Sequence, residues 1–192
     1  MTVVRFITHA EVNIDPGRPV AEWDLSPEGA QRMCALQDRS WIKSLVSIHS
    51  SNEPKAYQSA EILANAVGLG IKTNAGLREH DRSSTGYLPR EKFEEMLHAF
   101  FRYPEVTVRG WKPAVVEQTR VVTCVETILE SDPDGDIAIV SHGGVGALLM
   151  AHLAGEEISF DFDQGGSTGG NYFTFDRTTR EILQGWRSVE AD

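Results

Sequence analysis

Six short segments of the chain have the hydrophobic pattern of β-strands. Segment 137–141 (IAIVS) is almost entirely apolar, as expected of a strand that is covered on both faces. Segment 3–7 is β-branched and aromatic, and segment 171–175 alternates between apolar and polar positions. The other segments are weaker, and the full set of predicted strands is 3–7, 45–49, 71–74, 137–141, 171–175 and 182–187.

Helical patterns fill most of the sequence between these segments. Ser26 suits an N-cap, because Pro27 can take the first helical position and Glu28 adds an acid to the first turn. A proline also opens two later helices, and Gly155 suits the left-handed stop of the last one. The predicted helices are 26–41, 54–68, 90–103, 113–130 and 143–154.

The order of these elements predicts the fold class. Strands that alternate with helices favour a mostly parallel sheet with helices on both faces, a three-layer α/β/α sandwich. The stretch 76–112 is too long for a simple loop between a strand and the next core helix, so we interpret it as a helical cap inserted over one edge. Without a linker or an internal repeat, residues 1–192 are predicted to form a single domain.

The chain is strongly acidic, with a formal net charge of −10. This charge repels nucleic acids and anionic membranes, so neither is expected as a partner. It also repels phosphorylated compounds, so a phosphate site must provide its own positive charge. Cys34 and Cys124 form no disulfide or zinc pattern, and no segment has the pattern of a signal peptide or of a membrane span. These features predict a cytoplasmic protein.

Two histidines follow predicted strands at matching positions. His9 ends the first strand, and His142 ends segment 137–141 just before Gly143 and Gly144 open a helix. Ligands of open α/β sheets bind beyond the carboxyl ends of the strands, so both imidazoles are expected to face one ligand. The N–H groups at the start of that helix favour an anion. A purely structural role for each histidine is the alternative.

Five segments around these histidines resemble, in order, the motifs of the histidine phosphatase superfamily, which has the phosphoglycerate-mutase-like fold. FITHAEV, around His9, is similar to the first-strand Arg-His-Gly motif whose histidine is the nucleophile. IAIVSHGGVGALL, around His142, resembles the second-histidine motif. The other three are DLSPEGAQRM at 24–33, SSNEPKAYQSAEILA at 50–64 and LREHDRSSTG at 77–86.

The resemblance implies a phosphomonoester hydrolase that acts through a phosphohistidine intermediate on a small phosphorylated metabolite. His9 would be the nucleophile, and Glu79 would protonate the leaving oxygen, which requires a raised pKa. His142 and the N–H of Gly143 would stabilise the phosphoryl oxygens. No cofactor or metal is implied. A surface ion pair with Arg78 or Arg82 is the alternative role of Glu79.

The sequence departs from the family pattern where phosphate would bind. Thr8 replaces the arginine before the nucleophile, Ala10 replaces the following glycine, and Lys55 replaces a second arginine. Threonine and lysine lack the planar fork of donors that an arginine offers, so the site loses charge and aligned donors. Thr8 and Lys55 remain candidate substrate ligands, and Arg82 or Arg18 is expected to supply the missing charge. These changes leave open a catalytically weak or inactive protein that only binds phospho-ligands.

Two other functions are possible alternatives, a serine hydrolase and a metal-dependent protein. A serine hydrolase would use the sequence GGSTG at 165–169, but a strand pattern follows it and no histidine occurs after His152. We therefore interpret this segment as a flexible loop that lines the pocket. A metal site has no supporting spacing of ligands. The aromatic side chains of the cap either form an apolar entrance or pack the cap, and its exposed edge would permit a homodimer; they are Phe93, Phe100, Phe101, Tyr103 and Trp111.

Overall fold

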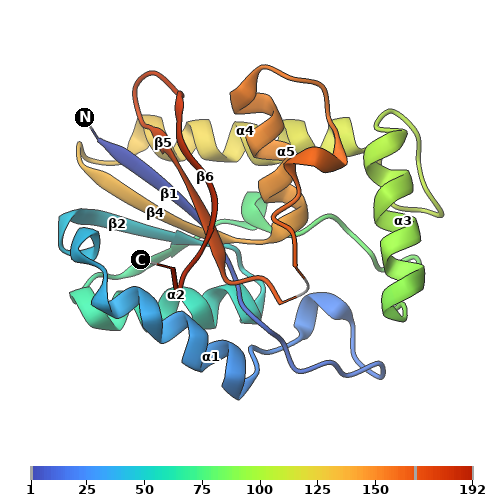
Figure 1. The fold of residues 1–192 in the computed structure, drawn as a ribbon, viewed down its shortest axis with the longest axis horizontal. Coiled ribbons are helices and arrows are strands. Elements are labelled where there is room, and N and C mark those ends of the chain that lie inside the picture. The colour runs from blue at the N-terminus through green and yellow to red at the C-terminus, as the bar shows by residue number, and fades with distance from the viewer. Residues whose placement is uncertain (1, 167, 192) are drawn as a thin grey trace.

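A computed structural model describes residues 2–166 and 168–191. Its centre is a six-stranded sheet with the order β3-β2-β4-β1-β5-β6 (Figure 1). All six predicted strands occur within about two residues of the expected bounds. They are β1 (Val3–Thr8), β2 (Leu45–Ser50), β3 (Ile71–Thr73), β4 (Asp136–Ser141), β5 (Asn171–Asp176) and β6 (Ile182–Ser188).

The helices cover both faces of the sheet, which confirms the predicted α/β fold class (Figure 1). They are α1 (Pro27–Met33), α2 (Pro54–Val67), α3 (Arg90–Arg102), α4 (Ala114–Ser131) and α5 (Gly143–Ala154). Short 3₁₀ helices occur at Val20–Glu22, Cys34–Asp38, Ser40–Ser44, Ala75–Leu77 and Phe160–Phe162. Within the described part of the chain, no helix combines the length and the apolar character that a membrane span needs.

The predicted end of the first helix was wrong. Instead of continuing through residue 41, it ends at Met33 and is followed by two 3₁₀ turns, with extended backbone at Arg39 between them. Leu36 and Ile42 are both buried in the same cluster. On a regular α-helix, side chains six residues apart point about 120° apart, so the break allows both to reach the core.

β1 lies in the middle of the sheet and carries the first histidine at its end. It pairs in parallel with β4 and antiparallel with β5. β2 pairs in parallel with both β3 and β4, so four neighbouring strands point the same way. The carboxyl ends of β1, β2 and β4 therefore meet at one edge, where Thr8, Ser50 and Ser141 are the last strand residues.

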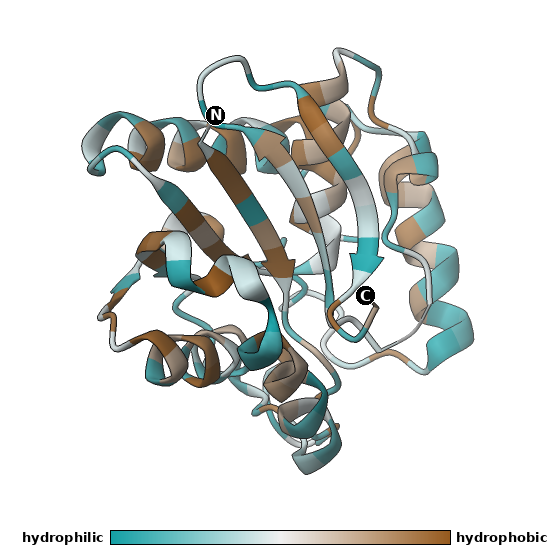
Figure 2. Cartoon of the chain, turned by 60° about the vertical axis from the view of Figure 1, so that its left-hand side comes forward, coloured by the Kyte–Doolittle hydropathy of each residue, from teal (hydrophilic) through white to brown (hydrophobic). Residues whose placement is uncertain are grey.

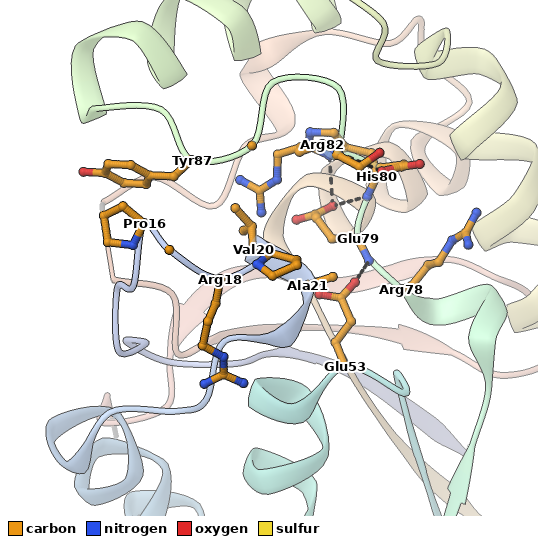
Figure 3. Close-up of a pocket in the computed structure, with 15 residues that line it drawn as sticks. Pro16, Arg18, Val20, Ala21, Glu53, Arg78, Glu79, His80, Arg82 and Tyr87 are labelled. Carbon is orange, nitrogen blue, oxygen red and sulfur yellow. Dashed lines mark hydrogen bonds and ion pairs between the residues drawn. The ribbon is translucent and has the colours of Figure 1, made fainter.

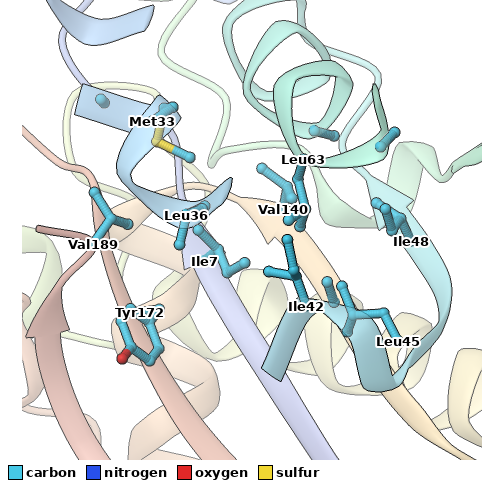
Figure 4. Packing of buried hydrophobic residues seen from close by; sticks show 14 of the residues in the cluster. Ile7, Met33, Leu36, Ile42, Leu45, Ile48, Leu63, Val140, Tyr172 and Val189 are labelled. Carbon is cyan, nitrogen blue, oxygen red and sulfur yellow. The ribbon is translucent and has the colours of Figure 1, made fainter. Parts of the chain in front are cut away.

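Two hydrophobic cores lie on opposite faces of this sheet. Ile7 and Val140 point to the face covered by α1 and α2, where Met33 and Leu63 pack on them (Figure 4). Their strand neighbours Phe6 and Ile139 are buried in the opposite core, with Val121 of α4 and Val145 of α5. Figure 2 shows hydrophobic residues concentrated on the central strands. Because alternate residues serve different cores, the register of β1 and β4 is strongly specified.

α3 lies at the side of the molecule beyond α5 (Figure 1). A third cluster joins it to the rest of the chain: Phe100, Phe101 and Trp111 are almost completely buried against Ala147 and Leu148 of α5. Tyr103 is half exposed. Packing therefore explains three of the five cap aromatics, and it leaves Phe93 as the cap aromatic that borders the main cavity.

Candidate active site

The structure brings His9 and His142 together. Their ring centroids are 5.1 Å apart and the rings meet edge to face at 71°. The contact follows from the parallel pairing of β1 with β4, which sets Thr8 beside Ser141 and lets the N–H of His9 donate to the carbonyl of Ser141 at 3.0 Å. Two histidines that are far apart in the sequence thus lie side by side beyond the carboxyl ends of β1 and β4.

The ring of His9 is held in one orientation. Its Nδ1 lies 2.7 Å from the carbonyl oxygen of Ala10, and this acceptor requires a proton on Nδ1. Burial lowers the pKa of His9 to about 3, and the nearby His142 and Lys55 act in the same direction. His9 is therefore neutral at pH 7, with its lone pair on Nε2, the form that a nucleophilic imidazole needs.

His142 is completely buried behind His9. Its Nε2 lies 2.8 Å from the hydroxyl of Ser51, whereas its Nδ1 has no partner among the described residues. Burial lowers the pKa of His142 to about 3, although the carboxylate of Glu79 opposes the shift. A neutral ring with an unpartnered nitrogen is unusual in a protein interior and makes His142 more than a packing residue.

The carboxylate of Glu79 caps helix α5. Its two oxygens accept from the N–H groups of Gly144 and Val145, each at 3.1 Å. The N–H and Nδ1 of His80 lie 3.0 and 3.1 Å from the same carboxylate. Glu79 thus occupies part of the anion site that the two glycines were expected to leave open.

The expected raised pKa of Glu79 is wrong. Burial alone would raise this pKa, but the interaction with His80 and the nearby charge of Arg82 hold it well below its ordinary value. A carboxylate that accepts several N–H groups is stabilised in its ionised form. In the absence of a ligand, Glu79 is therefore a carboxylate and not an acid. The alternative, a surface ion pair with Arg78, is not observed either. Glu79 is only 9% exposed, and its carboxylate is bonded to the start of α5 and to His80.

Lys55 lies at the start of α2 and is almost completely buried. Its Nζ donates to the carbonyl of Val20 at 3.0 Å and forms a close ion pair with Glu53. Burial lowers the pKa of Lys55, and the nearby charge of Glu53 opposes this. The second oxygen of Glu53 accepts from the N–H of Glu79 at 2.9 Å. The positive charge expected from Lys55 is therefore already balanced by an acid.

A cavity of about 780 Å³ opens over these residues. Its polar wall contains His9, Lys55, Glu79 and Gly143. Apolar side chains form much of the rest of its lining, among them Ile14, Val20, Trp23, Tyr87, Leu88, Phe93, Leu97 and Phe160. Charged side chains border it as well, including Glu11, Arg90, Glu94 and Asp163. A cavity that combines many apolar side chains with a few polar groups is typical of a site for a small organic ligand.

Arg82 also borders this cavity. Its guanidinium lies 5.0 Å from the centre of the Phe93 ring, and its charge acts on Lys55, Glu79 and His142. Figure 3 shows Arg82 beside Glu79 and His80, where a second cavity of about 530 Å³ opens toward the loop of Pro16 to Ala21. Arg82 is therefore placed as a candidate for the missing charge.

Arg18 takes a different orientation. Its guanidinium pairs with Asp24 at 3.1 Å and donates to the carbonyl of Glu22 at 2.6 Å. Figure 3 shows the side chain turned away from Glu79. Arg18 is thus engaged within its own loop and does not replace a family arginine.

Thr8 is fully buried and contacts the site through other residues. Its hydroxyl donates to Oε1 of Gln164 at 2.8 Å and accepts from the N–H of Asn171 at 3.0 Å. Gln164 lines the cavity, as do the glycines of the loop that follows it. This agrees with the interpretation of the glycine-rich segment as a pocket-lining loop. The serine of that segment, Ser167, lies outside the described residues.

Three residues of the site were not predicted: Glu53, His80 and Gln164. Glu53 lies two positions before Lys55, and His80 directly follows Glu79. Their closeness in sequence to predicted site residues could have indicated that they belong to the site. His80 is held between the rings of Phe100 and Trp111, each with its centroid 4.7 Å away. Gln164 has no motif around it. Among the described residues, no three side chains are gathered as metal ligands would be.

Comparison with known proteins agrees with this geometry. A family model described as the histidine phosphatase superfamily (branch 1) matches residues 9–184. A mycobacterial glucosyl-3-phosphoglycerate phosphatase in complex with inorganic phosphate is 19% identical, covers 100% of both chains and has a TM-score of 0.79. YhfR of Bacillus stearothermophilus is 19% identical, over 96% of this chain and 95% of that chain, with a TM-score of 0.80.

A putative alpha-ribazole-5'-P phosphatase from Escherichia coli is 17% identical, over 98% of each chain, with a TM-score of 0.77. A search of curated proteins found no match. The structural likeness supports the fold, and the family match spans most of the chain, including both histidines. The chain belongs to the histidine phosphatase superfamily.

Proposed function

We propose that the protein hydrolyses a small phosphomonoester through a phosphohistidine intermediate on His9. The observation that carries the proposal is the orientation of His9: the carbonyl of Ala10 holds Nδ1 at 2.7 Å, so the lone pair lies on Nε2 while the ring borders the cavity. A neutral, fixed imidazole that borders an open cavity is prepared for in-line attack on phosphorus.

The reaction takes two displacements. In the first, Nε2 of His9 forms a bond to phosphorus while the ester P–O bond breaks, and the leaving oxygen takes a proton from Glu79. In the second, a water oxygen attacks phosphorus, the N–P bond breaks, and Glu79 takes back a proton from that water. The products are the free alcohol and inorganic phosphate, with His9 neutral again.

Glu79 must gain a proton before it can give one. Its carboxylate is ionised without a ligand, because several N–H groups and nearby positive charges favour that state. A phosphoryl group bound beside it adds negative charge, which raises the pKa of Glu79. We therefore propose that proton uptake accompanies substrate binding. Arg82 and the N–H of Gly143 are the proposed contacts to the phosphoryl oxygens, with Lys55 and the buried His142 behind them.

The entrance supports an organic part that is at least partly apolar. Trp23, Tyr87 and Phe93 border the cavity, and the rings of Trp23 and Tyr87 lie 5.9 Å apart. We propose a phosphomonoester whose alcohol has an apolar or aromatic face that packs on these rings.

The alternative function is a protein that binds phospho-ligands with little or no turnover. It is favoured by the ion pair between Lys55 and Glu53. Lys55 is the cation at the position of the second family arginine, and the carboxylate of Glu53 offsets its charge. Arginine at that position would have kept its charge and offered two aligned donors.

The test uses p-nitrophenyl phosphate with wild-type protein, His9→Ala and a matched control, His98→Ala. His98 lines the same cavity but packs against Phe160, with the ring centroids 4.1 Å apart and the rings tilted by 38°. We expect turnover by wild type and by the control, loss of turnover in His9→Ala, and an acid-labile phosphorylated wild-type protein after rapid quenching. Equal rates in wild type and His9→Ala would refute the proposal, and phosphate binding without any turnover would favour the alternative.

A further inference from the structure

We infer that the side-chain amide of Gln164 donates to a phosphoryl oxygen and stands in for the arginine missing at position 8. This inference rests on the proposed function, since it assumes that a phosphoryl group binds beside His9. Thr8 is too short to reach the cavity, and its hydroxyl is bonded to Gln164 at 2.8 Å. Gln164 therefore occupies the space into which a longer side chain at position 8, such as arginine, would extend.

The hydrogen bonds fix which end of the amide faces the cavity. The hydroxyl of Thr8 accepts from the N–H of Asn171, so its own proton goes to Oε1 of Gln164, the closer of its two acceptors. Nδ2 of Asn171 donates to the same oxygen at 3.1 Å. With Oε1 bound twice, Nε2 turns the other way and has two protons to donate.

Nε2 of Gln164 lies over the start of helix α5. A Cβ atom built on Gly143 would come within 2.2 Å of Nε2, so the glycine next to His142 is required for this close approach. Among the described residues, neither Nε2 nor the N–H of Gly143 has a hydrogen-bond partner, and both border the cavity that His9 lines. Two unpartnered donors therefore lie side by side where the two histidines meet.

A carboxamide donates without adding charge, which changes what the site can stabilise. Among the described residues that line the cavity, Lys55 is paired with Glu53 and Arg90 with Glu94, so Arg82 is the lysine or arginine there without an ion pair. Glu79 adds a negative charge. Donors aimed at phosphoryl oxygens assist most as charge develops on them. The amide of Gln164 therefore supports the transition state but holds the dianionic product less strongly than a guanidinium would.

The experiment compares three variants with wild type on p-nitrophenyl phosphate. Gln164→Ala should lower kcat/KM by about 10²-fold, the usual effect of removing one such donor. Gln164→Glu keeps the shape and replaces the donor by an acceptor, so its loss should be at least as large at pH 7. Thr8→Val keeps the volume but removes one of the two donors that hold Oε1, so the amide is held less firmly, and we expect a loss of about tenfold, mainly in kcat. The matched control is Thr178→Val, at an exposed position of the turn between β5 and β6 and away from the cavity.

Coupling between the two positions separates a positioning role from a structural one. If Thr8 acts only by orienting Gln164, Thr8→Val adds nothing to Gln164→Ala, so the double variant has the rate of Gln164→Ala alone. Gln164→Glu covers the case in which the alanine variant does not fold, as checked by thermal melting. Activity within threefold of wild type for a folded Gln164 variant overturns the inference while His9 catalysis stands.

If wild type shows no turnover, the proposed function has failed and the inference is read from binding. Calorimetric titration with orthovanadate, a phosphoryl analogue, should then show at least tenfold weaker binding to Gln164→Ala than to wild type and to Thr178→Val. Equal vanadate affinity in all three proteins overturns the inference.

Discussion

Glu79 stabilises the start of helix α5, and this can be measured without a substrate. Glu79→Ala removes a charged acceptor from the N–H groups of Gly144 and Val145, each now bonded at 3.1 Å. Hydrogen bonds to ionised groups contribute about 1.5–3 kcal/mol each. Water from the adjoining cavity can partly replace the carboxylate, so we take the lower end for both bonds. We predict that Glu79→Ala lowers the free energy of unfolding by about 3 kcal/mol, measured by urea unfolding at pH 7.

Two further measurements refine this prediction. Glu79→Gln retains an acceptor oxygen but turns an amide N–H toward a backbone N–H, so we expect a loss of about 1–2 kcal/mol. The folded-state pKa of Glu79 is well below 4.5, so its stabilisation is complete above pH 4.5 and is lost as the pH falls through the lowered value. The difference between wild type and Glu79→Gln should therefore shrink below pH 4.5.

The control is Glu91→Gln in the first turn of α3, where the side chain is exposed. We expect it to stay within about 0.5 kcal/mol of wild type, as surface changes usually do. If Glu79→Ala is no less stable than this control, the carboxylate does not hold α5, and the hydrogen bonds described here contribute nothing to folding.

The remaining predictions concern a glycine and a buried histidine. Gly29→Ala should lose about 1–3 kcal/mol on urea unfolding, because its Cβ would lie 2.2 Å from the carbonyl oxygen of Glu11, whereas Gly185→Ala meets no atom within 4 Å and should be neutral or slightly stabilising; equal effects would contradict this reasoning. His142 has a pKa of about 3 in the folded state and about 6.5 when unfolded, so the unfolded chain binds the extra proton and stability falls with decreasing pH between these values. Between pH 6 and pH 4, wild type should lose about 1.4 kcal/mol per pH unit more than His142→Asn, and parallel losses would show that His142 titrates normally.

The sequence was sufficient to predict the strands, most helices and the meeting of His9 with His142. Segment 137–141 needs two buried faces, and only a central strand offers them. When two parallel strands are adjacent in the sheet, the residues that follow their carboxyl ends are neighbours in space. The end of α1 at Met33 was not predictable in this way, because burial of both Leu36 and Ile42 depends on tertiary contacts.

The charge states of the site residues were harder to predict from the sequence than which residues form the site. Whether Glu79 is an acid or an anion depends on N–H donors of α5, about 65 residues later in the chain. The charge of Lys55 depends on the direction in which Glu53 points. Gln164 belongs to a loop without periodicity or motif, so its contact with Thr8 can be found only from the fold.

The position of β1 has a consequence for the order of events during synthesis. Its two partners are β4, beginning at Asp136, and β5, beginning at Asn171, so the first strand made is among the last to be paired. Until then, its apolar side chains have no neighbouring strand, and they are a natural target for chaperones or for aggregation on the ribosome. A fragment that stops before residue 136 would carry His9 at the end of a strand without partners, so the candidate site assembles only after β4 and β5 have emerged.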